Sequence, residues 1–192
     1  GKQTGTKVLK IIDKDGLTIS LSPSRGMGIL SVYSGDIRLG WDSPVKEYVN
    51  PAYINLESRN GIGWLDGFNE TVVRCGYEWS GHPVTEKDGY VYTLHGKAQN
   101  TPASFVEVII EEGKKIIIRG LVRENTFKKC NFATMMELHY TISTQTFHIH
   151  DTLTNHGDYE HTYQIIYHSN YGQPILGEGS TVHLAAEKIS PF

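Results

Sequence analysis

The chain has 192 residues, of which 18 are Lys or Arg and 21 are Asp or Glu, giving a formal net charge of −3 at pH 7. This length is enough for one domain with a substantial core. The chain has no run of basic residues that would mark a nucleic-acid partner, and no apolar run approaches the roughly 18 residues of a membrane-spanning helix. We therefore expect neither nucleic acid nor a membrane as a partner.

The first residues, Gly1 to Gly5, lack the apolar core of a signal peptide, and we expect a cytoplasmic protein. A leader removed before Gly1 would be equally compatible with a secreted or periplasmic protein. The two cysteines, Cys75 and Cys130, are too far apart in sequence for a Cys-x-x-Cys metal or redox pair. Two free buried thiols are favoured over a disulfide.

Strand patterns recur along the chain as short β-branched or alternating runs between Gly, Pro, Asn and Asp, whereas helical periodicity is nearly absent. The predicted strands are Lys7–Ile12, Leu17–Leu21, Gly28–Tyr33, Tyr90–His95, Ser104–Glu111, Lys115–Val122, Phe132–Ile142, Thr146–Leu153 and Thr162–His168. Residues 13–16 and 111–114 have the composition of turns between them. Closely spaced strands without intervening helices predict a large antiparallel β-sandwich.

Two predicted strands contain continuous apolar stretches. The runs Glu107–Ile110 and Ile116–Ile118 are expected to be buried on both faces, as in an inner sheet of a large sandwich. Residues Gly40–His82 break the strand pattern, because the segment is rich in Gly, Pro, Asn and Trp. Its aromatic residues argue against disorder, so we expect an ordered excursion over one face of the sheet. Residues 1–192 are expected to form a single domain.

Two histidines occur in similar contexts. His95 is followed directly by Gly96 at the end of a predicted strand, and a glycine there allows close approach of another chain segment or a ligand. His168 ends another predicted strand, just before a Gly/Pro turn. Each alone is more typical of a structural histidine. Two polar residues at strand ends are well placed to face one cleft, which makes them the best catalytic candidates.

A second group of histidines offers a different interpretation. His148 and His150 alternate on one predicted strand and therefore point to the same side. Together with His139 or His161 they would give a metal site of the kind found in cupin barrels. A polar outer strand face is favoured instead, because the nearest following acidic residue, Asp151, falls on the opposite face. No metal or other cofactor is expected.

Several charged residues are candidate ligand-binding groups. Arg25, Arg59, Arg74 and Lys97 are potential donors to hydroxyl groups. Glu137 lies in an otherwise apolar predicted strand, where a carboxylate is either paired in the interior or directed at a ligand.

Short motifs in a fixed order resemble the aldose 1-epimerase-like family DUF4432 of the galactose-mutarotase-like superfamily. They are Ser24-Arg25-Gly26-Met27-Gly28, Leu39-Gly40-Trp41-Asp42-Ser43-Pro44, Gly63-Trp64, Gly67-Phe68, Arg74-Cys75-Gly76-Tyr77, Gly81-His82-Pro83, Leu94-His95-Gly96-Lys97, Asn100-Thr101-Pro102-Ala103 and Tyr167-His168-Ser169-Asn170-Tyr171-Gly172-Gln173-Pro174. The resemblance implies an all-β supersandwich with a sugar cleft on one face, and a free sugar as the small-molecule partner.

The resemblance also implies a reaction, in which the anomers of an aldose interconvert by acid–base opening of the ring. By motif, His168 corresponds to the general acid, and His95 corresponds to the histidine that binds the sugar near the ring oxygen and C1. Arg59 or Arg74 would replace the family's sugar-binding arginine, and Lys97 stands where relatives often carry Arg. The expected substrate-binding residues are Arg74, Lys97, Asn170, Arg59, Glu137 and Trp64.

The resemblance has one departure. The family's binding Asp and base Glu follow the last matched motif on later strands, and neither Glu178 nor Glu187 lies in the base motif. We therefore expect a domain lacking its C-terminal strands, and a homodimer formed through the open sheet edges. A non-catalytic carbohydrate-binding module on the same fold is the first alternative, and a metal-dependent cupin-like enzyme is the second.

Overall fold

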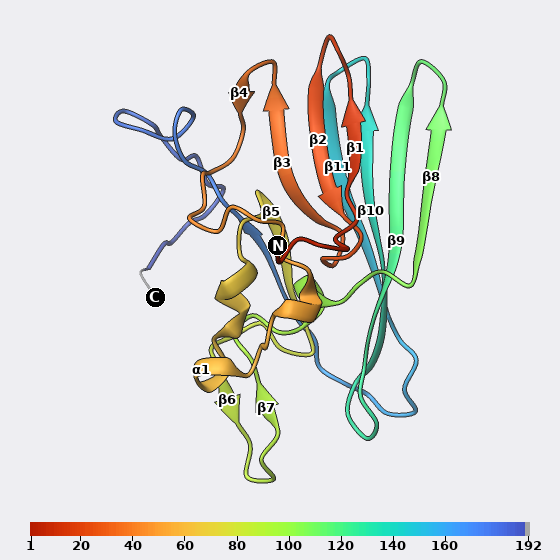
Figure 1. Cartoon of the computed structure of the whole chain (residues 1–192), viewed down its shortest axis with the longest axis vertical. Helices are drawn as coiled ribbons and strands as arrows, with labels where there is room; N and C mark the ends of the chain where they lie inside the picture. Colours follow the sequence, from red (N-terminus) through yellow and green to blue (C-terminus); the bar gives the residue numbers. More distant parts are fainter. Residues whose placement is uncertain (191–192) are drawn as a thin grey trace.

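The computed structural model describes residues 1–190, which form β-strands with very little helix. Two larger antiparallel sheets and one two-stranded hairpin make up the regular structure (Figure 1). The predicted fold class, an antiparallel β-sandwich, is therefore confirmed. None of the helices within residues 1–190 has the length and apolar character needed to cross a membrane.

The first large sheet contains both chain-terminal strands of the fold. Its order is β1-β2-β3-β5-β12, with β4 paired to β3. The strands are β1 (Leu9–Ile12), β2 (Leu17–Ser22), β3 (Gly28–Ser34), β4 (Ile37–Arg38), β5 (Val72–Tyr77) and β12 (Gln164–Ser169). The predicted turn at residues 13–16 joins β1 to β2, and the Asp13 amide donates to the Leu17 carbonyl at 3.1 Å.

The second large sheet is a meander of four strands in the order β11-β10-β9-β8. The strands are β8 (Phe105–Glu111), β9 (Lys115–Asn125), β10 (Asn131–Thr141) and β11 (Thr146–Asn155). The predicted turn at residues 111–114 joins β8 to β9, with Gly113 at a φ of +67° that a side chain would disfavour.

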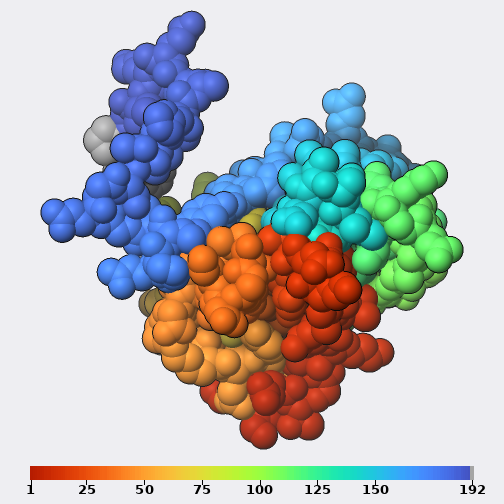
Figure 2. All heavy atoms as spheres, turned by 90° about the horizontal axis from the view of Figure 1, so that it is seen from above, coloured from red at the N-terminus to blue at the C-terminus, as the bar shows by residue number. Residues whose placement is uncertain are grey.

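Short elements fill the remaining chain. The small hairpin pairs β6 (Val84–Thr85) with β7 (Val91–Tyr92), and it projects from the end of the molecule opposite the β1–β2 turn (Figure 1). Helical turns are η1 (Pro51–Tyr53), α1 (Ser58–Gly61), η2 (Gly63–Gly67) and η3 (Ala98–Asn100). Residues 170–190 carry no regular secondary structure and extend away from the sheets (Figure 2).

Apolar side chains from both large sheets fill the space between them. Alternation along each strand selects these residues, since successive side chains point to opposite faces. The first sheet contributes Ile19, Leu21, Ile29 and Val32, and the second contributes Ile118, Val122, Met136, Leu138 and Tyr140. Each fully buried aliphatic side chain contributes roughly 1.5–3 kcal/mol to stability, so this core holds the two sheets together.

The prediction that Glu107–Ile110 and Ile116–Ile118 are buried on both faces is wrong. β8 is an edge strand, and its Val108 and Ile110 are 47% and 69% exposed. In the second run, Ile118 is fully buried and its neighbours only partly so. β-branched runs predict a strand but not its place in the sheet, which depends on pairings distant in sequence.

Two further strand predictions need correction. The segment Gly40–His82 is ordered, but it is more than an excursion over the sheet, because it contains the internal strand β5. The predicted strand Tyr90–His95 shortens to Val91–Tyr92. His95 therefore lies in a turn after β7, with a left-handed φ of +58°.

Candidate functional site

Strand pairing sets the direction of His168. β12 pairs antiparallel with β5, and His168 lies directly opposite Val73. Residues opposite one another share a face of the sheet, so His168 projects on the same side as Val73 and Cys75. That face packs against Trp64 and Leu94 in a small apolar cluster, separate from the core between the large sheets.

A glycine contact sets the position of His95. The next residue, Gly96, has a φ of +74°, and a Cβ there would collide with the Trp79 carbonyl oxygen and lie 2.7 Å from the Gly76 carbonyl oxygen. The Gly76 amide in turn donates to the His95 carbonyl at 3.1 Å. The glycine after His95 thus lets the turn approach the end of β5, in agreement with its predicted purpose.

The two histidine rings meet on this outer face of the first sheet. The ring centroids of His95 and His168 are 5.5 Å apart, and the ring planes are inclined by 73°. Trp64 lies 4.7 Å from His95 and Phe68 lies 5.1 Å from His168, both edge-on and measured between ring centroids. Both imidazoles are partly buried, so two aromatic side chains back a pair of accessible imidazoles.

Neighbouring groups define the protonation of each ring. His95 Nδ1 lies 3.0 Å from the Ser80 carbonyl oxygen, which only accepts hydrogen bonds, so Nδ1 carries a proton. In the neutral ring, Nε2 is then the acceptor. Burial, followed by the nearby charge of His95, lowers the pKa of His168, and a hydrogen bond involving Asn170 opposes this. His168 is therefore mainly neutral at pH 7.

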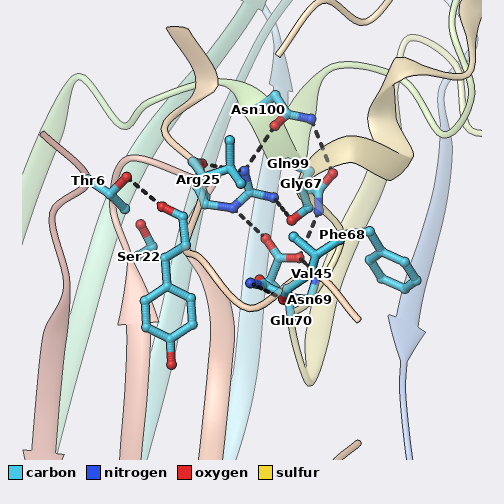
Figure 3. Close-up of polar contacts among 12 residues, drawn as sticks. Thr6, Ser22, Arg25, Val45, Gly67, Phe68, Asn69, Glu70, Gln99 and Asn100 are labelled. Atoms are coloured by element: carbon cyan, nitrogen blue, oxygen red, sulfur yellow. Dashed lines mark hydrogen bonds and ion pairs between the residues drawn. The ribbon is translucent and has the colours of Figure 1, made fainter. Parts of the chain in front are cut away.

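A buried ion pair fixes the segment that carries Phe68 (Figure 3). Arg25 Nε donates to Glu70 Oε1 at 2.8 Å, and both side chains are 0% exposed. The Nη1 and Nη2 atoms donate to the carbonyl oxygens of Val49 and Gly67, each at 2.7 Å. Arg25 is therefore not a donor to a ligand, which corrects the sequence-based expectation.

Glu70 also connects this network to the end of β12. Its backbone oxygen accepts hydrogen bonds from Trp41 Nε1 at 2.8 Å and from Asn170 Nδ2 at 3.0 Å. Asn170 Nδ2 further lies 3.5 Å from the His168 carbonyl oxygen. Asn170 thus lies beside the histidine pair, with its amide nitrogen bonded to the backbone.

Arg74 lies away from the histidine pair. It is opposite Tyr167 in the β5–β12 pairing, and therefore on the face that His168 does not share. Its Nε and Nη2 atoms donate to Asp151 at 2.6 and 2.8 Å, and Nη1 donates to the Met27 carbonyl at 3.1 Å. Both members of the ion pair are 4% exposed. The guanidinium bridges the two sheets, contrary to its expected place at the site.

Glu137 and Arg59 also differ from expectation. Glu137 lies in the four-stranded sheet, where it contacts His139 Nε2 at 2.8 Å and Arg119 at 3.8 Å, and so it is not part of the histidine site. Arg59 lies in α1, before Trp64, but its exposed guanidinium is paired with Asp66 at 2.7 Å.

Lys97 lies two residues after His95 in the sequence, and Trp64 is close to His95 in space. Lys97 Nζ donates to the Tyr90 hydroxyl at 2.7 Å and lies 3.6 Å from Glu78. Together with Tyr90 and other residues of its segment it lines a cavity of about 220 Å³. Trp64 is 1% exposed, so it supports the imidazoles from beneath and offers no open face for stacking.

Two contacts of the site are not predicted by the sequence. Phe68 packs on His168, and the Ser80 carbonyl orients His95. The Gly67-Phe68 motif could have indicated the first contact. No local pattern indicates the second, because it arises where the turn at Gly96 crosses the end of β5.

The histidines of the second sheet lie on its outer face. The centroids of His139 and His150 are 4.6 Å apart, and those of His148 and His150 are 6.4 Å apart. Their nitrogens do not converge as a set of three. Within residues 1–190, the metal-type ligand atoms that do converge belong to Glu78, Glu124 and Cys130.

Comparisons with known proteins agree with this architecture. The model of the family described as domain of unknown function DUF4432 matches residues 3–192. A crystal structure from Klebsiella pneumoniae subsp. pneumoniae, provisionally described as an aldose 1-epimerase, is 64% identical with a TM-score of 0.87. The match covers 93% of this chain and 47% of the other, so the chain spans about half that protein's length. No curated protein matches the chain.

Proposed function

Because the chain belongs to the DUF4432 family, we propose that it binds a free aldose at His95 and His168 and takes part in interconverting the sugar's anomers. The observation that carries this proposal is the approach of the two imidazoles to 5.5 Å on one outer face of the sheet. The solved relative's provisional description as an aldose 1-epimerase supports the same class of reaction.

Ring opening of an aldose requires a proton at the ring oxygen and loss of a proton from the anomeric hydroxyl. In this proposal His168 donates the first proton from its imidazolium form, which is the minor form at pH 7. Its lowered pKa makes this imidazolium a stronger acid than that of an ordinary histidine. His95, with Nδ1 held by the Ser80 carbonyl, presents Nε2 to a sugar oxygen. We assign no residue of this chain to the base.

The substrate-binding residues of the proposal follow from their positions. Asn170 stays in it because its amide lies beside the His168 carbonyl oxygen. Lys97 stays because it follows His95 by two residues, and Arg59 because its neighbours Leu56 and Ile62 pack on the cluster with Trp64. Trp64 stays as a support for the rings. Arg74 and Glu137 do not, because one bridges the two sheets and the other lies in the four-stranded sheet.

A carbohydrate-binding module on the same fold is the second candidate. It rests on the same pair of imidazoles, which can hold a sugar by hydrogen bonds without transferring a proton. This alternative predicts saturable sugar binding without faster anomer exchange.

Exchange NMR on a panel of free aldoses tests both candidates. We expect faster exchange between anomers with the unaltered chain and its loss in His168→Ala. His148→Ala is the matched control, since this exposed histidine lies on the other sheet. Binding without exchange would favour the module, and neither binding nor exchange with any aldose would refute both.

A further inference from the structure

Three buried side chains with metal-binding atoms meet where the two large sheets join at one end. Glu78 directly follows β5, Glu124 lies near the end of β9, and Cys130 directly precedes β10. One ligand atom from each lies within 4.8 Å of the others. All three residues are buried, so the cluster is part of the interior and not a chance gathering of surface charges.

The Glu78 carboxylate is incompletely satisfied. Its side chain is 2% exposed, and its Oε2 accepts a hydrogen bond from the Tyr90 hydroxyl at 3.1 Å. Its Oε1 is buried and has no hydrogen-bond partner. Burying a carboxylate oxygen without a hydrogen-bond partner destabilises the fold, and so this oxygen is available to a ligand.

Short-range backbone contacts hold the other two groups in place. Glu124 Oε1 accepts from the Glu78 amide at 3.1 Å, and its Oε2 accepts from the Tyr77 amide at 2.7 Å. Cys130 Sγ donates to the Glu124 carbonyl at 3.3 Å, across the turn between β9 and β10. Both ligands are therefore positioned before any ion arrives.

We propose that Glu78, Glu124 and Cys130 form a binding site for a thiophilic divalent cation of the zinc type. Two carboxylates and a thiolate carry three negative charges, which one divalent ion and the neighbouring Lys97 ammonium balance. Sulfur with oxygen ligands suits zinc better than magnesium or calcium, and a water molecule can complete four-coordination. The ion would tie β5 of one sheet to β9 and β10 of the other.

Binding at this site releases a proton from the thiol. Burial, and then the charges of Glu78 and Glu124, raise the pKa of Cys130 to about 12, so the sulfur is protonated at neutral pH without an ion. A bound cation stabilises the thiolate and displaces the proton.

Cobalt(II) titration of the chain, produced without a chelating tag and first treated with EDTA, tests the site. A thiolate ligand gives Co²⁺ a sulfur-to-metal absorption in the near ultraviolet, which surface histidines do not produce. In Cys75→Ser, Cys130 is the sole thiol, and we expect one equivalent of Co²⁺ with this absorption, displaced by Zn²⁺. Glu78→Gln is expected to weaken binding about 10-fold or more.

The two single-thiol variants show which of the two cysteines binds the ion. Cys130→Ser retains Cys75 and is expected to lose the absorption. No absorption from the unaltered chain at saturating Co²⁺, or an absorption that persists in Cys130→Ser, would overturn the proposal. The result does not depend on sugar binding, so it stands or fails separately from the proposed function.

Discussion

Arg74 and His168 lie on opposite faces of the same pair of strands. Arg74 of β5 is opposite Tyr167 of β12, while His168 is opposite Val73. Arg74 therefore points between the sheets, towards Asp151, and His168 points to the outer cluster with Trp64. The ion pair that stabilises the fold and the histidines of the candidate site thus lie on different faces of one sheet. Substitutions can therefore affect stability and the site separately.

Loss of the Asp151 carboxylate should destabilise the fold strongly. Asp151→Ala leaves the Arg74 guanidinium buried without its partner, at a cost of about 3–5 kcal/mol in the free energy of unfolding. Urea denaturation measures this loss. Asp66→Ala is the matched control, because it removes the partner of exposed Arg59 and should destabilise the fold far less. Equal losses in the two variants would contradict the bridging function of Arg74.

Gly96→Ala should disrupt both the fold and the placement of His95. The added Cβ meets the carbonyl oxygens of Trp79 and Gly76 in a left-handed conformation. We expect a loss well above the roughly 1 kcal/mol typical of an open glycine position. Gly113→Ala provides that reference, because its φ is also positive and nothing lies within 4 Å of the added Cβ. Thermal unfolding of the two variants gives the comparison, and similar losses would argue against the close contact.

Local patterns in the sequence predict most strands but not their neighbours. β10 and β11 alternate clearly, so their limits agree with the prediction to within a residue or two. β5 is missed because it lies within Gly40–His82, which is rich in Gly, Pro, Asn and Trp, and its apolar residues also include Arg74. That arginine is tolerated in the strand only because Asp151, distant in sequence, neutralises it between the sheets.

The candidate site is predictable only in part for the same reason. The order of the motifs predicts His95 and His168 as candidates, and the structure places their rings close together. Which arginine lies beside them depends on the register of β5 against β12, and a one-residue shift would exchange the two faces. No pattern within either strand specifies that register.

The homodimer through open sheet edges stays a prediction, for which sedimentation velocity is the direct measurement.

Both thiols should resist modification in the folded chain. Burial raises the pKa of Cys75 to about 12, assisted by the charge of Glu70, and the pKa of Cys130 is also about 12. The thiolate is the reactive form, so we expect negligible reaction with a disulfide reagent at pH 8. After unfolding in urea without reductant, both cysteines should react, because both are free. Fewer than two reactive thiols in the unfolded chain would indicate a disulfide.

Acidification should weaken the fold through His168. Its pKa is lowered from the ordinary value of 6.5, chiefly by burial, so the folded state disfavours the protonated ring. Above pH 6.5 both folded and unfolded chains hold this ring neutral, and stability from this group is fully present. As pH falls from about 6.5 towards the lower folded pKa, the unfolded chain binds more protons, and stability decreases.

Urea unfolding between about pH 5 and 8 measures the slope of the unfolding free energy against pH. His168→Gln should flatten it, whereas His148→Gln, an exposed histidine of the other sheet, should leave it unchanged. If both variants kept the slope, another group would have to carry the pH dependence, and partial burial of His168 beside Phe68 and His95 would not disfavour its protonated ring.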